Sequence, residues 1–319
     1  MRAIVIGCTL AVAFTSCPDV GAQYPDRPIR IIMPFPAGAT ADTVARVVAA
    51  PLSQALGQTV LVDNRPGADG AMAAELAARS PADGYTLFSG GNTQILGVPT
   101  LRKNPPYDPL RDFTPITQLV RFAFFLVVHP GTPVKTVSDL VDYARAHPGR
   151  LNYASGNVNG ILAAAQLMSL TGVNIVHVPY KGEPLAIPDL LDARVHLMFG
   201  TGGVVAPLVK EGKLRALATL APARTALLPD VPTVSEIGMP RLSIVIWNGL
   251  FAPAKTPKEI VERLSREVNA ILKRDEVREQ FARQGVEPSS STPEEFAAFV
   301  KQQLVDWGKA AREAGMRPE

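Results

Sequence analysis

Apolar runs alternate with amphipathic stretches along most of the chain. Residues 29–33 form a β-rich apolar run that ends at Pro34, and residues 41–56 repeat valine and leucine at helical spacing. Pro51 lies inside this expected helix and should kink it. The next expected strand, helix and strand cover residues 59–63, 70–78 and 85–89. This βαβαβ order predicts a parallel, doubly wound sheet with right-handed crossovers.

A second series of α/β elements follows. Its expected strands cover residues 124–129, 151–154, 175–179, 196–199 and 214–219. Its expected helices cover residues 137–146, 160–170, 184–191 and 204–210. A strand over 244–251 then leads to three helices, over residues 257–272, 276–284 and 293–314. Thr256 and Thr292 precede the first and last of these helices as expected N-caps.

Two α/β units in series predict a two-lobe molecule. The C-terminal helices need a lobe to pack on, and we expect them to return to the first lobe. Lobe 1 then comprises residues 23–123 and 245–319, and lobe 2 comprises residues 124–244. The chain would cross between the lobes near residues 122–129 and 240–247. Two such crossings form a hinge beside a cleft, a known arrangement for closing around ligands.

The N-terminal segment has the layout of a secretory signal peptide over residues 1–22. Arg2 precedes an apolar run over residues 3–14, and small residues allow cleavage after Ala22. This layout predicts a periplasmic protein. A lipoprotein signal with lipidation of Cys17 is one alternative, and a buried N-terminal helix is another.

Composition narrows the classes of function. The chain has 319 residues, of which 47% are hydrophobic and 19% charged, and a formal net charge of +3. These values fit a soluble globular protein, and the absence of a basic block leaves nucleic-acid binding without support. Cys8 and Cys17 both lie in the expected leader, so the mature chain would have no disulfide, reactive thiol or cysteine metal site. No later segment approaches the roughly 20 apolar residues of a membrane span.

The first candidate binding loop lies between the first expected strand and helix. Its candidate residues are Phe35, Pro36, Ala37, Gly38, Ala39, Thr40 and Asp42. Ligands bind at the carboxyl edge of parallel strands, and a helix N-terminus favours an anion there. Gly38 and its small neighbours permit close backbone approach, so a carboxylate fits this loop. The alternative is a simple tight turn in which Asp42 stabilises the start of the helix.

The second candidate loop occupies the matching position in the second series. Its residues are Ser155, Gly156, Asn157, Val158, Asn159 and Gly160. The alternative here is that the asparagine side chains cap turns and hold left-handed backbone. Neither loop contains Arg or Lys, so recognition of a carboxylate across the cleft would depend on backbone amides and hydroxyl groups.

Further candidates are less distinctive. Ser89, Gly90, Gly91 and Asn92 follow the strand over 85–89 and are expected to line the cleft, unless they form an ordinary loop. The other candidate residues that could reach the cleft are Tyr180 and Thr201.

Three more features have mainly structural interpretations. Lys181 is expected to be structural, and Trp247 to pack in the core rather than to wall the pocket. The segment Gly200-Thr201-Gly202-Gly203 resembles part of a dinucleotide fingerprint, but Val205 stands where the sixth-position glycine belongs. We therefore expect no such cofactor.

No reactive constellation supports an enzyme. The sequence has no Gly-x-Ser-x-Gly elbow, P-loop or His-Glu-x-x-His pattern. Its four histidines are scattered, and those on expected strands alternate with apolar residues as structural histidines do. We predict a binding protein without catalytic residues, metal or cofactor.

A series of motifs makes the chain resemble a known family. The motifs lie at residues 24–30, 34–42, 56–58, 64–68, 83–87, 107–109, 112–113, 148–149, 153–155, 178–182, 212–215, 228–233 and 252–253. In this order they resemble the substrate-binding proteins of tripartite tricarboxylate transporters, the Bordetella uptake gene (Bug) family. The resemblance implies a type II periplasmic binding protein fold that closes on a small organic carboxylate held by the two loops. It also implies transient contact with integral-membrane transporter subunits.

The chain also departs from the family pattern. Ala39 replaces the second glycine of the first loop, and Asn159 and Leu162 occupy the region where the family often has a His. These departures place the family's usual ligand preference in doubt and favour a less polar ligand. We expect a monomer, and the alternative role is a ligand sensor that signals to a sensor kinase.

Overall fold

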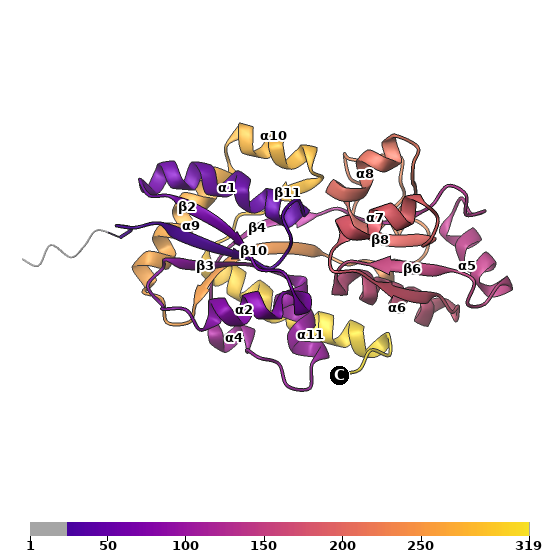
Figure 1. The fold of residues 1–319 in the computed structure, drawn as a ribbon, viewed down its shortest axis with the longest axis horizontal. Helices are drawn as coiled ribbons and strands as arrows, with labels where there is room; N and C mark the ends of the chain where they lie inside the picture. Colours follow the sequence, from indigo (N-terminus) through magenta and orange to yellow (C-terminus); the bar gives the residue numbers. More distant parts are fainter. Residues whose placement is uncertain (1–23, 319) are drawn as a thin grey trace, which may run out of the picture.

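The strands of the protein assemble into two separate sheets, which lie side by side along the long axis of the molecule (Figure 1). This computed structural model describes residues 24–318, so the expected leader and Cys17 lie outside the described residues. The described residues confirm the predicted α/β class and the presence of two lobes.

The first sheet has six strands in the order β11-β4-β10-β3-β1-β2. Their bounds are β1 Ile29–Met33, β2 Val60–Asn64, β3 Thr86–Gly91, β4 Phe113–Phe122, β10 Ile246–Pro253 and β11 Val286–Pro288. The strands β1, β2 and β3 are parallel, as the βαβαβ pattern predicted. The sheet becomes mixed beyond them, because β10 is antiparallel to both β3 and β4.

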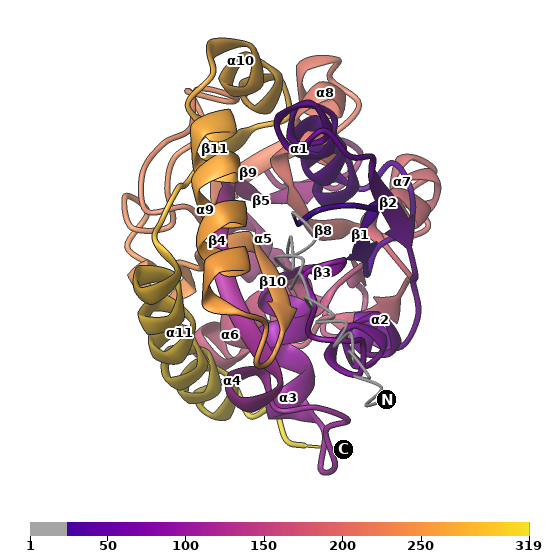
Figure 2. The same cartoon turned by 90° about the vertical axis from the view of Figure 1, so that its left-hand side faces the viewer.

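Helices from both ends of the chain cover this sheet. They are α1 Thr40–Leu56, α2 Ala71–Ala78, α3 Val98–Leu101, α4 Pro109–Asp112, α9 Lys258–Leu272, α10 Asp275–Arg283 and α11 Pro293–Glu313, with the short helices η1 Ala68–Gly70 and η2 Asn92–Gly97. Helix α1 buries Val44, Val48 and Leu52 at four-residue spacing and continues through Pro51. The C-terminal helices α9 and α11 pack on β4, and α11 also reaches α6 of the other lobe (Figure 2).

The second sheet has five strands in the order β7-β6-β8-β5-β9. Their bounds are β5 Phe124–Val128, β6 Asn152–Ser155, β7 Val176–Pro179, β8 Leu197–Thr201 and β9 Arg215–Thr219. Its helices are α5 Val137–Ala146, α6 Val158–Thr171, α7 Glu183–Leu191 and α8 Gly202–Lys210, followed by η3 Pro240–Leu242. The strand β6 is parallel to β7 and β8, and β5 is antiparallel to β8 and β9.

The chain passes between the sheets at two places. Ala123 alone separates β4 from β5, and its backbone N–H donates to the carbonyl of Gly285 while its carbonyl accepts from the N–H of Gly202. The second passage follows β9 and ends where β10 begins at Ile246. Both passages therefore run beside elements of the two sheets.

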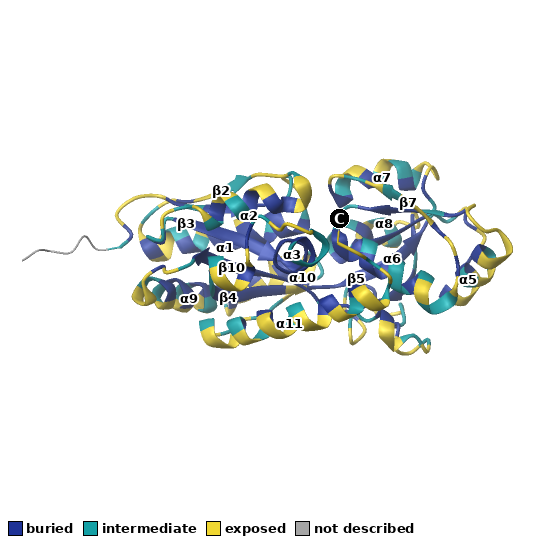
Figure 3. Ribbon diagram, turned by 90° about the horizontal axis from the view of Figure 1, so that it is seen from below, coloured by how far each residue is buried: buried dark blue, intermediate teal, exposed yellow. Residues whose placement is uncertain are grey.

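The sheets form the buried interior, and the outer faces of the helices are exposed (Figure 3). All eight residues of β10 are buried. The indole of Trp247 on this strand packs edge-to-face against Phe296 of α11, with 5.5 Å between ring centroids. This aromatic packing holds α11 against β10.

Several elements differ from expectation. The strand β3 continues to Gly91, so Ser89, Gly90 and Gly91 lie within the strand rather than after it. Glycine disfavours strands, but a Cβ on Gly91 would overlap the carbonyl oxygen of Trp247 on the neighbouring strand, so close backbone approach overrides the propensity. Strands β4 and β11 were not expected.

The two expected N-caps have different outcomes. The hydroxyl of Thr256 donates to the carbonyl of Pro253 instead of capping α9, so that prediction is wrong. The prediction for Thr292 is confirmed, because its hydroxyl accepts from the N–H of Glu295 and forms a capping box.

The aromatic packing around β10 gives a stability prediction. A Cβ on Gly249 would overlap the ring of Phe296, a fully buried side chain, with Cε1 at 2.6 Å. Gly249→Ala should therefore lower the free energy of unfolding by about 1–3 kcal/mol, measured by chemical denaturation. Gly308→Ala is the matched control on α11, because its Cβ would meet the end of the Arg312 side chain at 3.4 Å and the methyl group of Thr100 at 4.0 Å, which are ordinary contacts. An unchanged stability of Gly249→Ala would contradict this packing.

Candidate ligand-binding site

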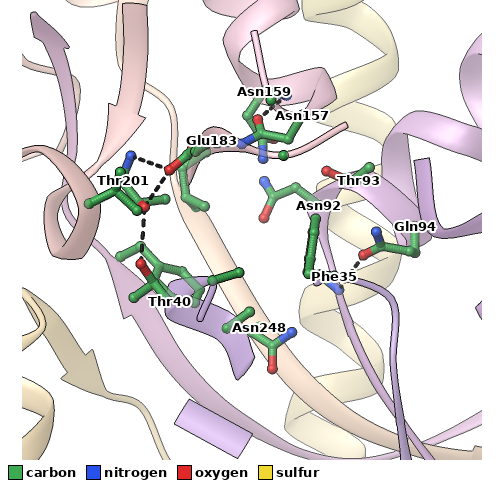
Figure 4. A pocket seen from close by; sticks show the side chains of 18 of the residues that line it. Phe35, Thr40, Asn92, Thr93, Gln94, Asn157, Asn159, Glu183, Thr201 and Asn248 are labelled. Carbon is green, nitrogen blue, oxygen red and sulfur yellow. Dashed lines mark hydrogen bonds between the residues drawn. The ribbon is translucent and has the colours of Figure 1, made fainter. Parts of the chain in front are cut away.

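A cavity lies between the two sheets, and residues at the starts of four α-helices of the two lobes line it (Figure 4). The helices are α1 of the first lobe and α6, α7 and α8 of the second. The cavity has a volume of about 60 Å³, room for a few water molecules at roughly 10–15 Å³ each. Its lining residues are Phe35, Pro36, Ala39, Thr40, Ala41, Gly91, Asn92, Thr93, Gln94, Phe122, Gly156, Asn157, Asn159, Gly182, Glu183, Pro184, Thr201, Val204, Ile246, Trp247 and Asn248.

The first candidate loop presents the N-terminus of α1 to this cavity. No side chain caps this helix at Ala39. Gly38 has a left-handed φ of +85°, and its N–H donates to the carboxylate of Asp42 at 3.1 Å. Asp42 therefore stabilises the loop without lining the cavity. The N–H groups of the first turn of α1 have no hydrogen-bond acceptor within the helix.

Asp42 is a buried carboxylate with a complete set of partners. Arg46 donates to it at 3.1 Å and Asn64 at 2.8 Å, in addition to the N–H of Gly38. Burial alone would raise the pKa of Asp42, but these hydrogen bonds and the charge of Arg46 outweigh burial and hold the pKa below its usual value.

Most polar side chains of the second candidate loop hydrogen-bond to other groups of the protein. The side-chain oxygen of Asn157 caps α6 by accepting from the backbone N–H groups of Asn159 and Gly160. Ser155 forms a 2.6 Å hydrogen bond with Nε2 of His177. Asn159 is different, because its buried side-chain oxygen has no hydrogen-bond partner among residues 24–318.

The most informative lining residue is Glu183, the first residue of α7. One carboxylate oxygen accepts from the amide of Asn157 at 2.7 Å. The other accepts from the Thr201 N–H at 3.0 Å and from the Thr201 hydroxyl at 2.6 Å. The Glu183 carboxylate therefore occupies the N-terminus of α8 and uses donors that the sequence analysis assigned to a ligand.

This carboxylate is buried without a neighbouring cation. Glu183 is 6% exposed, and it forms no ion pair within the described part of the chain. Burying an ionised carboxylate costs several kcal/mol, and hydrogen bonds to a charged group contribute about 1.5–3 kcal/mol each. Burial accordingly raises the pKa of Glu183, although the hydrogen bonds from Thr201 and Asn157 oppose the rise.

A chain of hydroxyl groups joins Glu183 to the first lobe. The oxygens of Thr201 and Thr40 lie 3.2 Å apart. Since the hydroxyl proton of Thr201 is donated to Glu183, Thr40 is the donor to Thr201. Pro36 also lies close to Gly182, where an added Cβ would be 3.3 Å from the proline ring. The two lobes are therefore in direct contact around the cavity.

The back wall of the cavity comes from η2, a π-helical turn, and from β10. Asn92 accepts from the N–H of Trp247 and donates to the carbonyl of Val245, so it fixes the start of β10. Asn248 accepts from the hydroxyl of Ser89 at 2.9 Å. Single π-helical turns occur frequently at functional sites.

The structure brings about half of the candidate residues to the cavity. Those that line it are Phe35, Pro36, Ala39, Thr40, Gly91, Asn92, Gly156, Asn157, Asn159 and Thr201. Those that do not line it are Ala37, Gly38, Asp42, Ser89, Gly90, Ser155, Val158, Gly160 and Tyr180. Tyr180 instead donates to Asp189 at 2.6 Å. The two candidate loops thus share one cavity, while several of their residues act as supports.

The sequence analysis missed other lining residues. Gln94 lies on η2, which was not expected. Glu183 and Val204 directly follow more conspicuous motifs, at residues 180–182 and 200–203. Trp247 contributes to the lining, but it is 1% exposed and its ring packs in the core, as expected. Glu183 could have been noticed, because it follows a glycine at the start of an expected helix.

Residues 24–318 contain neither a candidate metal site nor a candidate membrane span. Within residues 24–318, no His, Cys, Asp or Glu side chains gather in threes or more around a position that could hold a metal ion. None of the helices in that range combines the length and apolarity needed to cross a bilayer.

The fold and the cavity between lobes define the class. Solved periplasmic binding proteins share this two-lobe fold, which confirms the predicted type II architecture. A family model described as "Tripartite tricarboxylate transporter family receptor" matches residues 44–316. The chain belongs to this family of solute-binding proteins, as the motif resemblance predicted.

Similar proteins include a relative from Bordetella and two structures with bound ligands. Protein BugT of Bordetella pertussis is 34% identical over 98% of this chain and 97% of its own length. The structure of R. palustris Rpa4515 with adipate is 35% identical, covers 93% of this chain and 100% of its own, and has a TM-score of 0.89. MatC from Rhodopseudomonas palustris with bound malate is 31% identical, covers 90% and 99%, and has a TM-score of 0.84.

The contacts of Asp42 predict a pH-dependent contribution to stability. The native pKa of Asp42 is depressed, so its stabilisation is present above the unfolded pKa of about 3.9 and is lost as the pH falls through the native pKa. Asp42→Asn should lower the free energy of unfolding by about 1–2 kcal/mol at pH 7, and the difference should shrink below about pH 4. Denaturation of both proteins across pH measures this. A constant difference at all pH values would exclude a charge effect.

The hydrogen bonds of the Thr201 hydroxyl give a second prediction about stability. Thr201→Val removes one of three donors to a buried carboxylate and the acceptor for Thr40. The free energy of unfolding should fall by about 1.5–3 kcal/mol in urea denaturation at pH 7. Thr201→Ser, which keeps the hydroxyl, should lie within about 1 kcal/mol of the wild type. Equal stability of the valine and serine variants would show that the hydroxyl is unimportant.

Proposed function

We propose that this protein captures a small carboxylate-bearing molecule between its lobes and delivers it to the membrane subunits of a tripartite tricarboxylate-type transporter. The observation that carries the proposal is the N-terminus of α1, which has no side-chain cap, at a cavity between the lobes that no Lys, Arg or His lines. Backbone N–H groups at a helix start bind anions without a cationic side chain. The adipate and malate bound to the two similar structures support the same ligand class.

We further propose that the lobes move about the two passages of the chain. In this proposal lobe 1 comprises residues 23–123 and 245–319, lobe 2 comprises residues 124–244, and the hinge lies near residues 122–129 and 240–247. The contact between Thr40 and Thr201 supports it, because this contact joins the two lobes beside the cavity and would open if the lobes moved apart. Closure around a ligand would then restore it.

The proposed site performs no reaction. Ser155 and His177 form a hydrogen-bonded pair that resembles a nucleophile with its base, but Ser155 does not line the cavity. Export to the periplasm through residues 1–22 completes the proposed role, because the receptor family consists of periplasmic proteins that bind solutes.

A ligand screen tests the proposal. The mature protein should gain thermal stability from one or a few small carboxylates, tested with adipate, malate, succinate, glutarate and the corresponding amino acids. A ligand at 100 times its Kd should stabilise by about 2.7 kcal/mol. Isothermal titration calorimetry then gives the Kd of each hit. No saturable response to any of these acids would refute the proposal.

A matched pair of glycine variants links the response to the cavity. A Cβ on Gly156 would overlap the backbone of Glu183, so Gly156→Ala should displace a wall of the cavity and weaken binding roughly tenfold or more. A Cβ on Gly160, one turn into α6, would meet the carbonyl oxygen of Phe199 at 3.4 Å, an ordinary contact. Gly160→Ala should bind like the wild type. Equal weakening in both variants would place the ligand elsewhere.

A further inference from the structure

Two adjacent glycines at the start of α8 lie where the lobes meet. Gly202 and Gly203 end the segment over residues 200–203 that resembles part of a dinucleotide fingerprint. Both lie in a helix and neither has a positive φ, so the backbone conformation does not require glycine at either position. The contacts around them give a different reason for the absence of side chains.

Gly202 is hydrogen-bonded to the passage between the lobes. Its N–H donates to the carbonyl of Ala123, the single residue between β4 and β5, and the N–H of Ala123 donates to the carbonyl of Gly285. One residue of the crossing chain is therefore bonded to both lobes. A rotation of the lobes about this passage separates contacts here least, and contacts farther from it more.

Gly203 contacts the opposite lobe. A Cβ at this position would lie 2.8 Å from Oγ1 and 3.0 Å from Cγ2 of Thr40, and 2.9 Å from the carbonyl oxygen of Gln284. Thr40 begins α1 and Gln284 follows α10, so all three atoms belong to the first lobe. The Gln284 oxygen is part of the backbone and cannot turn aside as the end of a flexible side chain can. A side chain at position 203 is therefore incompatible with this arrangement of the lobes.

The same threonine forms a hydrogen bond between the lobes. The side-chain oxygens of Thr40 and Thr201 lie 3.2 Å apart (Figure 4), and the Thr40 side chain also occupies the space beside Gly203. The hydrogen bond to Thr201 and the close contact with Gly203 thus form in the same position of the lobes. Gly203 does not line the cavity, so it acts on the cavity only through that position.

We propose that Gly203 is a positioning residue for closure, and that Thr40 and Gln284 form the stop against which the first turn of α8 comes to rest. This inference rests on the proposed function, in which the lobes part and then close around a ligand. A side chain at position 203 raises the free energy of the closed form alone, because the overlapping atoms belong to the other lobe. The closed population and the apparent affinity for ligand then fall together, and the open form is unaffected.

The closed population can be measured without a ligand. Both cysteines of the chain lie in the expected leader, so introduced thiols have no competitor in the mature protein. Thr40→Cys with Thr201→Cys places two thiols where hydroxyl oxygens lie 3.2 Å apart, so a disulfide between them forms only when the lobes are closed. Adding Gly203→Ala to this pair should slow disulfide formation about tenfold or more at a fixed oxidant concentration, measured by mass spectrometry after thiol alkylation.

Gly160→Ala is the matched control for the cross-linking rate. Gly160 lies in the first turn of α6, and the atoms nearest to its Cβ would be those of Phe199 and Ser155, in its own lobe, at 3.4 Å or more. This variant should cross-link at the rate of the parent cysteine pair. Equal slowing in both glycine variants, or an unchanged rate in Gly203→Ala, would overturn the proposal. Absence of the disulfide in the parent pair would mean that the lobes do not reach this position in solution, which overturns it as well.

Thermal unfolding separates an effect on closure from an effect on folding. Without ligand, Gly203→Ala in the otherwise wild-type mature protein should melt within about 3 °C of the wild type, because the open form has no overlap. A variant that is unfolded by circular dichroism, or that melts far lower, would show that the contact persists in the free protein and that the lobes do not part there. That result is incompatible with the proposal.

Binding of adipate and malate gives an independent readout by isothermal titration calorimetry. The Kd of each acid that binds the wild type should rise about tenfold in Gly203→Ala and stay within about twofold in Gly160→Ala. If the acids bind and cross-linking is unaffected by Gly203→Ala, the proposed function stands and this inference fails. If neither acid binds and cross-linking is slowed, the closing stop stands and the proposed ligand class loses its support.

Discussion

Parallel strands that end at one edge of a sheet impose the constraint on which this site depends. Strands β1 and β6 each lead through a loop into a helix, β8 leads directly into α8, and the starts of those helices meet at one cavity. Each helix start has N–H groups without intrahelical partners, and these groups bond to side chains, water or a ligand. The helix α6 uses its own Asn157 for this purpose and α8 uses Glu183, whereas α1 and α7 have no side-chain cap.

The same constraint explains which parts of the fold were predictable. Strands β1, β2 and β3 with helices α1 and α2 are formed by residues close in sequence, so their periodicity predicts them well. The long strand β4 and the short strand β11 depend on pairing with partners far along the chain. Propensity also failed at the end of β3, where Gly90 and Gly91 remain in the strand. A Cβ on Gly91 would overlap the backbone of Trp247 on the neighbouring strand, and a Cβ on Gly90 would overlap the ring of Phe88.

The candidate site was predictable in position but not in the use of its donors. Strand-to-helix loops predict that residues near Thr40 and Asn157 share a cavity, as they do. No local pattern could show that the amide of Asn157 and both donors of Thr201 turn toward Glu183, because these residues are far apart in sequence. Similarly, Ser155 and Tyr180 looked like ligand contacts, but His177 and Asp189 bind their hydroxyl groups.

Two buried carboxylates on either side of the cavity show how the chain distributes charge. Asp42 lies behind the first loop and has Arg46 as its cation, so its charge is balanced within the lobe and its pKa is lowered. Glu183 lies at the cavity with neutral donors only, and burial raises its pKa. The first carboxylate needs nothing more, and it shapes a loop. Whenever the second is ionised, no cation among the described residues balances its charge, and a charge in that position discriminates between ligands by their own charge as well as by their shape.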